Sequence, residues 1–92
     1  MKILRLNMTF SVQKFLMELS AKQFKQIVGK IFFLLKDPAP NDSSRLHGYP
    51  YYRVDIGEYR IIYDFDPEEL RIILIGKRND DNVYRQLSRF YK

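Results

Sequence analysis

Residues 51–77 read YYRVDIGEYRIIYDFDPEELRIILIGK, and this stretch predicts three strands joined by two short turns. The runs span 51–56, Tyr59–Phe65 and 70–77. In the second run, Tyr59, Ile61, Tyr63 and Phe65 fall on one face, as in a half-buried strand. The third run is apolar on both faces, which suits a central strand. Gly57-Glu58 and residues 66–69 are typical of hairpin connections. The three runs therefore predict consecutive antiparallel strands.

Upstream of these strands the pattern predicts one strand and two helices. Residues 2–8 alternate and indicate a half-buried strand, and Ser11 is a candidate N-cap for a short helix after it. Ser20 and Gln23 form a capping box for a longer amphipathic helix, which should end at Asp37 because Pro38 follows. Gly29 inside this helix suggests a close contact with the neighbouring helix, and residues 38–44 should form a loop.

Downstream, Asp80 or Asp81 could cap a short last helix that carries Val83, Leu87 and Phe90. The expected order is β-α-α-β-β-β-α. We therefore predict an α+β fold, with a helical hairpin packed on a mostly antiparallel four-stranded sheet. Residues 1–92 contain no linker, repeat or low-complexity segment, which indicates a single domain.

The composition restricts the possible functions. The net charge of +5 and pI of about 9.6 favour an anionic partner, although many basic surfaces only keep a protein soluble. The chain has no cysteine, which excludes disulfides, thiolate chemistry and cysteine-based zinc sites. No apolar stretch approaches the roughly 20 residues of a membrane span, so we expect no membrane partner.

Three arginines and one tyrosine stand at or near the ends of the strand runs: Arg53, Arg60, Arg78 and Tyr84. A guanidinium offers a planar fork of donors and a permanent charge, and a tyrosine offers a stacking face and a hydroxyl. If the runs pair in order, the arginines gather in one concavity suited to a phosphodiester. The alternative is that they pair with nearby carboxylates at the surface. The carboxylates within reach are Asp55, Glu58, Asp64 and Asp80.

The remaining candidates have simpler interpretations. His47 has no evident partner, and a single histidine beside a turn glycine is more often a surface residue than a catalyst. The adjacent Asp80 and Asp81 are more often helix caps than metal ligands. Tyr84 could stack on a base or serve only the structure. We therefore predict no metal site and no cofactor.

Taken in order, these residues resemble the RelE/ParE toxin superfamily of bacterial toxin–antitoxin systems, and specifically its RelE branch. The resemblance covers nearly the whole chain and is carried by an ordered set of short motifs. They are the LKDP that ends the long helix at 35–38, LHGY at 46–49, YR at 52–53, GEYRIIY at 57–63, GKR at 76–78 and VY at 83–84.

The resemblance implies a RelE-like fold and a cytoplasmic toxin of a type II system. It implies a metal-independent endoribonuclease that cuts mRNA in the ribosomal A site, with attack of a ribose 2′-OH on the adjacent phosphate. The implied partners are the ribosome, mRNA and a cognate antitoxin in a heteromeric complex. The implied catalytic residues are Arg53, Arg60, Arg78 and Tyr84.

One position departs from the family pattern. Asp55 stands where RelE has a lysine proposed as the base. A carboxylate among arginines should have a lowered pKa, so we expect that Asp55 is not the general base. The alternatives are a ParE-like toxin that inhibits DNA gyrase without cutting RNA, and a non-toxic basic nucleic-acid-binding domain.

Overall fold

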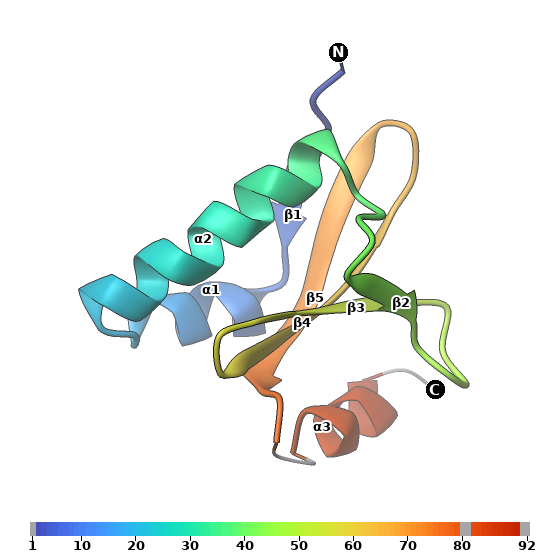
Figure 1. The fold of residues 1–92 in the computed structure, drawn as a ribbon. Coiled ribbons are helices and arrows are strands. Elements are labelled where there is room, and N and C mark those ends of the chain that lie inside the picture. Colours follow the sequence, from blue (N-terminus) through green and yellow to red (C-terminus); the bar gives the residue numbers. More distant parts are fainter. Residues whose placement is uncertain (1, 80–81, 91–92) are drawn as a thin grey trace.

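The computed structural model describes residues 2–79 and 82–90, which form a sheet covered by helices on both faces (Figure 1). The elements follow the predicted order with one addition, the short strand β2. They are β1 (Arg5–Met8), α1 (Phe10–Met17), α2 (Ala21–Lys36), β2 (Ser43–Arg45), β3 (Tyr52–Ile56), β4 (Tyr59–Phe65), β5 (Glu69–Lys77) and α3 (Asn82–Phe90).

The sheet has five strands in the order β1-β5-β4-β3-β2. β1 runs parallel to β5, and the other pairs are antiparallel. The predicted α+β class is confirmed, but the predicted four strands are one too few. β2 overlaps the expected loop 38–44, and pairing with β3 makes it a strand although Ser-Ser-Arg has little intrinsic β tendency.

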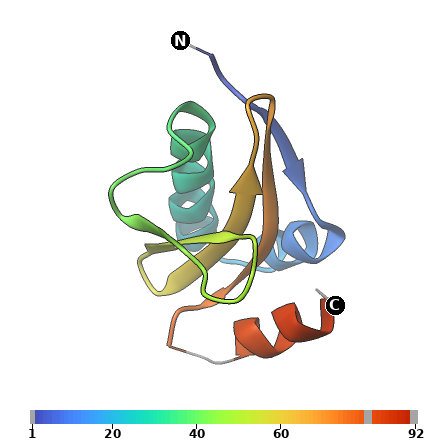
Figure 2. The same ribbon diagram turned by 90° about the vertical axis from the view of Figure 1, so that its right-hand side faces the viewer.

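Each face of the sheet has its own apolar core. On one face, α1 and α2 supply Val12, Leu16, Ile27, Ile31 and Leu34 to a cluster that also contains Tyr59, Ile61 and Tyr63 from β4. On the other face, α3 covers a smaller cluster. Figure 2 shows from a second side how this helix lies against the sheet. Its buried members are Leu46, Tyr51, Ile62, Ile73, Leu74, Val83 and Leu87. Arg60, which follows Tyr59 on β4, was expected on the face of the sheet that the helical hairpin leaves open, and α3 partly covers that face.

Side-chain caps fix the starts of the first two helices. Ser20 accepts a hydrogen bond from the Gln23 N–H, and α2 ends at Asp37, so both expectations are confirmed. For α1 the expected cap is wrong: Thr9 caps the helix by accepting from the Val12 N–H. The Thr9 hydroxyl also donates to the Ile73 carbonyl at 3.0 Å, so one side chain fixes α1 to β5.

The long helix α2 buries only a narrow stripe, while Phe24 and Phe32 remain 43% and 57% exposed. The expected close contact at Gly29 is wrong, because a Cβ there would meet no atom within 4 Å. Among the described residues, no helix is both long and apolar enough to cross a membrane.

Gly57 and Gly29 form a matched pair for a stability test. Gly57 has φ +58°, where an L-residue costs about 1–2 kcal/mol. Gly57→Ala should therefore destabilise the protein. Gly29→Ala should stabilise it by up to about 1 kcal/mol, because the helical site has free space. Urea denaturation measures both changes. A Gly57→Ala variant as stable as the wild type would contradict the turn geometry.

Candidate anion-binding site

The α3-facing side of β3, β4 and β5 carries the predicted arginines. Strand pairing sets Asp55 opposite Arg60, and Arg60 opposite Gly76 on β5. Arg53 lies opposite Ile62, whose side chain belongs to the cluster under α3. Because side chains of one strand alternate between faces, Arg53, Asp55 and Arg60 share this side of the sheet.

Arg60 is held by two partners and is largely withdrawn from water. Its Nε donates to Asp55 Oδ1 at 2.8 Å, and its Nη2 donates to Asp55 Oδ2 at 3.2 Å. Its Nη1 donates to the Tyr84 hydroxyl, and its Cζ lies 5.8 Å from the centre of the Tyr84 ring. The Arg60 side chain is only 14% exposed. For this arginine, the expected alternative of pairing with Asp55 is confirmed.

Arg53 and Arg78 complete the cluster from either side. The Arg53 Nε donates to Ser44 Oγ on β2 at 3.1 Å. The backbone N–H of Arg78 donates to the Glu58 carbonyl at 2.9 Å, which holds this residue beside the β3–β4 turn. In the described part of the chain, no ion pair involves either guanidinium.

Asp55 is the carboxylate partner of Arg60 and also feels the charges of Arg53 and Arg78. The hydrogen bond from Arg60 is the main reason that the pKa of Asp55 lies below its usual value, and the charges of Arg53 and Arg78 act in the same direction. The Asp55 hydrogen bond also raises the pKa of Arg60, and the Tyr84 hydroxyl adds to that effect. Of the three predicted arginines, the structure puts Arg60 in direct contact with Asp55, while the charges of Arg53 and Arg78 add to the lowering of its pKa. A carboxylate with a lowered pKa is a poor proton acceptor near neutral pH.

Tyr84 reaches the cluster because α3 sits close to the end of β5. A Cβ at Gly76 would lie 3.3 Å from Val83 Cβ, so the glycine lets the helix approach the strand. Val83 is 3% exposed and Leu87 is fully buried. The expected caps Asp80 and Asp81 lie outside the described residues. His47 is exposed, as expected for a surface residue.

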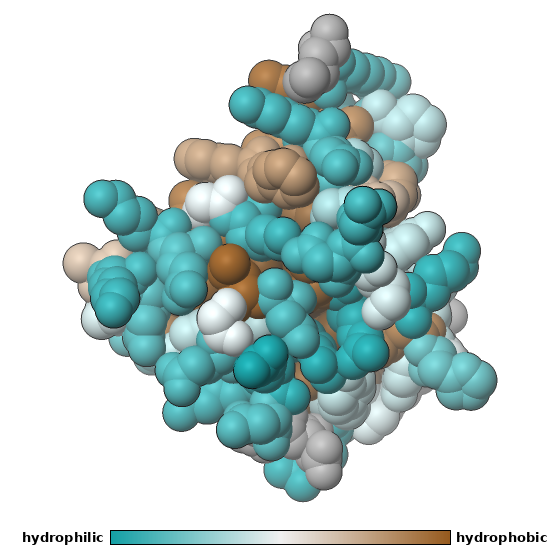
Figure 3. Space-filling view, viewed as in Figure 1, coloured by the Kyte–Doolittle hydropathy of each residue, from teal (hydrophilic) through white to brown (hydrophobic). Residues whose placement is uncertain are grey.

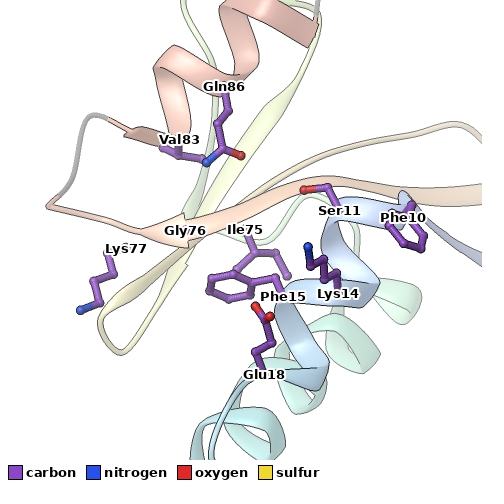
Figure 4. Close-up of a pocket in the computed structure, with 10 residues that line it drawn as sticks. All are labelled: Phe10, Ser11, Lys14, Phe15, Glu18, Ile75, Gly76, Lys77, Val83 and Gln86. Atoms are coloured by element: carbon purple, nitrogen blue, oxygen red, sulfur yellow. The ribbon is translucent and has the colours of Figure 1, made fainter.

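A groove of about 600 Å³ borders the cluster at Gly76 and Val83 (Figure 4). It runs between α1 and α3 across β5, and its lining includes none of the three arginines. The lining residues are Phe10, Ser11, Lys14, Phe15, Glu18, Ile75, Gly76, Lys77, Val83 and Gln86. Of the α1 residues in this lining, only Ser11 was named from the sequence, as a helix cap, because only the folded chain shows that α1 lies beside this part of β5.

The residues present suit an anion better than a metal. Across residues 2–79 and 82–90, no group of three or more His, Asp and Glu side chains is arranged to hold a metal ion. The cluster instead offers guanidinium donors and a phenol, which match the oxygens of a phosphate.

Comparison with known proteins gives a family match over most of the chain. Residues 10–82 match the family model described as the ParE toxin of the type II toxin–antitoxin system parDE. The matched span contains the three arginines and ends two residues before Tyr84. A search of curated proteins finds no match.

Several solved structures share the fold. A double mutant of the Escherichia coli toxin RelE in the free state has 20% identity and a TM-score of 0.79, covering 98% of this chain and 99% of that one. The archaeal RelE–RelB complex from Pyrococcus horikoshii gives 24% identity and a TM-score of 0.72, with 83% and 96% covered. The RelBE2 complex from Mycobacterium tuberculosis has 21% identity and a TM-score of 0.71, and the match covers 87% of this chain and 97% of that one.

The lowered pKa of Asp55 makes a prediction about stability and pH. A depressed folded-state pKa stabilises the fold at pH values above the unfolded value of about 3.9, and that contribution is lost as the pH falls through the folded-state pKa. Asp55→Asn should therefore be less stable than the wild type at pH 7, and the difference should shrink below about pH 4. Urea denaturation at pH 7 and pH 2.5 tests this. An equal difference at both pH values would refute it.

Proposed function

The chain belongs to the ParE toxin family of type II toxin–antitoxin systems, and we propose that it is a cytoplasmic, metal-independent endoribonuclease that cleaves mRNA in the ribosomal A site. The resemblance to the RelE branch and the shared fold support this activity. The observation that carries the proposal is the contact of Arg60 with both the anionic Asp55 and Tyr84, in a region whose positive charge Arg53 and Arg78 increase.

The proposed reaction is an in-line transesterification. The ribose 2′-OH gives its proton to water as its oxygen forms a bond to the adjacent phosphorus. The bond to the 5′-oxygen breaks and water returns a proton to that oxygen, so the products are a 2′,3′-cyclic phosphate and a free 5′-hydroxyl. Negative charge grows on the phosphate oxygens and on the leaving oxygen. Fixed guanidiniums stabilise such charge without reorganising during the reaction, and this effect is often the largest single contribution to catalysis.

The residues divide the work according to their exposure. Arg53 and Arg78 form no ion pair in the described part of the chain, and in the proposed mechanism they hold the scissile phosphate and neutralise the leaving oxygen. Arg60 adds a third positive charge to the site, and its hydrogen bond to the Tyr84 hydroxyl holds that side chain in position. Tyr84 stacks on the base and orients the 2′-OH, which lowers the entropic part of the barrier. Asp55 is ionised and takes no proton.

A second candidate function has its own support. The family model that matches is that of ParE toxins, and Asp55 replaces the basic residue that the RelE pattern has there. Both observations favour a ParE-like inhibitor of DNA gyrase that cuts no RNA.

One experiment separates the two activities. The chain is expressed in cells, and both mRNA 5′ ends and gyrase-linked DNA breaks are mapped. New ribosome-dependent 5′ ends support the endoribonuclease, whereas DNA breaks alone support the gyrase inhibitor.

The proposed partner is a cognate antitoxin with an acidic amphipathic segment that folds across the helical hairpin. The structures of RelE–RelB and RelBE complexes support a partner of this kind. Apolar side chains break the polar surface over α2 in Figure 3. A groove of about 340 Å³ lies among Leu6, Met17, Phe24 and Phe32, which are all exposed, and Lys22 and Lys25 flank it on α2. Apolar burial with basic neighbours suits an acidic amphipathic partner.

Arg78→Ala should strongly reduce cleavage without disturbing the fold. Its side chain is exposed, while loss of one fixed charge donor typically slows a reaction by about 100- to 1000-fold. The measurement is the cleavage rate of mRNA on purified ribosomes. Arg5→Ala is the matched control, because it removes the same charge from an exposed position on β1. Equal rates for wild type and Arg78→Ala would remove Arg78 from the proposed site.

Antitoxin binding should respond differently to salt and to loss of apolar contact. Raising salt from about 0.1 to 1 M shortens the Debye length from about 10 to 3 Å, so association should slow far more than dissociation quickens. Phe32→Asp should instead quicken dissociation. Stopped-flow kinetics with the protein encoded by the adjacent gene measure both rates. An association rate indifferent to salt would contradict charge steering, and no binding would contradict the antitoxin proposal.

A further inference from the structure

The Asp55 carboxylate fills the hydrogen-bonding fork of the Arg60 guanidinium. Its two carboxylate oxygens accept from Nε and Nη2 of Arg60 at 2.8 and 3.2 Å. A phosphate binds a guanidinium through the same pair of parallel hydrogen bonds. The charges of Arg53 and Arg78 favour the ionised form of this carboxylate. The side chain of Asp55 therefore stands in for an external anion.

We propose that Asp55 is a built-in competitor for the phosphate, whose carboxylate fills the fork of Arg60 and must leave before the three arginines can close on a substrate. The inference rests on the proposed function for the identity of the anion as an RNA phosphate. The competition itself concerns binding and involves no chemical step.

The two partners of the ion pair differ in their freedom to move. The Asp55 side chain is 36% exposed, whereas that of Arg60 is 14% exposed and is also held by Tyr84. The carboxylate is therefore the partner that yields, because it can regain water by rotating outwards. Arg60 then presents a prearranged fork to the phosphate.

Competition also lowers the charge of the cluster. While Asp55 is seated, it cancels one of the three positive charges that would otherwise attract an anion. A phosphate that enters without displacing it meets a negative group at hydrogen-bonding distance from Arg60. The site should consequently bind free RNA weakly and gain affinity when this one carboxylate is neutralised.

The opposite role for Asp55 makes a different prediction. If the carboxylate served only to orient Arg60 and Tyr84, its removal would loosen both residues and weaken binding. The direction of the change in affinity therefore distinguishes a competitor from a positioning residue. The structure supplies a control for net charge in Asp64, which pairs with Arg71 at 2.7 Å on the same sheet.

The test compares Asp55→Asn with Asp64→Asn, which raise the net charge equally. The probe is a fluorescein-labelled six-nucleotide 2′-O-methyl RNA, which cannot be cleaved, and fluorescence anisotropy gives the dissociation constant without ribosomes. Asp55→Asn should bind about tenfold or more tightly than the wild type, the range expected for one charge-assisted hydrogen bond. Asp64→Asn should change affinity by less than about threefold, because its charge is remote and screened.

A second measurement follows Arg60 directly. In ¹⁵N spectra, the Nε–Hε signal of Arg60 should shift with inorganic phosphate at lower concentration in Asp55→Asn than in the wild type. If Asp55→Asn does not fold, as judged by near-ultraviolet circular dichroism, Asp55→Ser replaces it as the neutral variant. Equal affinity in Asp55→Asn and Asp64→Asn would overturn the proposal, as would weaker binding by Asp55→Asn. Neither result depends on whether the wild type cleaves mRNA, so this failure is distinguishable from failure of the proposed function.

Discussion

Withdrawal of the Arg60 guanidinium from water is the constraint on which the site depends. A cation that loses hydration needs charged or polar partners in good geometry, and Arg60 finds them on two elements that are distant in the sequence. Asp55 comes from β3 across a two-residue turn, and Tyr84 comes from α3 after β5 has ended. One side chain thus couples the β3–β4 hairpin to the last helix. Any change that moves one of these elements disturbs the charges presented to an anion.

Apart from the contact between Tyr84 and Arg60, α3 is held mainly by two buried apolar side chains. Nine residues are too few for a stable isolated helix, so α3 depends on burial of Val83 and Leu87 against the sheet. Gly76 permits that approach, since a side chain there would press on Val83. The smaller apolar core is therefore also the support of the site. It keeps Tyr84 over Arg60 while leaving Arg78 exposed beyond the end of β5.

Local sequence patterns predicted the elements whose signals lie within a few residues. The bounds of β4, the Ser20 cap and the end of α2 at Asp37 follow from alternation, capping chemistry and Pro38, and all three are confirmed. β2 and the Thr9 cap were missed because tertiary partners define them: β2 exists through pairing with β3, and Thr9 is also bonded to β5. The gathering of the arginines followed from strand order. The sequence left open whether these arginines pair with carboxylates. The register of a hairpin with a two-residue turn at Gly57-Glu58 nevertheless sets Asp55 opposite Arg60.

Overall charge and local charge serve different steps of recognition. The +5 net charge draws the protein toward any polyanion at long range, and one carboxylate in the cluster hardly changes that field. Stabilisation of a reacting phosphate depends instead on charges fixed within a few ångströms, where Asp55 removes one of three. If Asp55 competes with an RNA phosphate as proposed, the protein meets RNA often, but binding of a phosphate by the three arginines costs the free energy needed to displace the carboxylate. Such binding becomes favourable only where the RNA is already held in position, because bound substrate then supplies the energy needed to displace the carboxylate. Under the proposed function, such competition would restrict cleavage to RNA that a larger assembly presents.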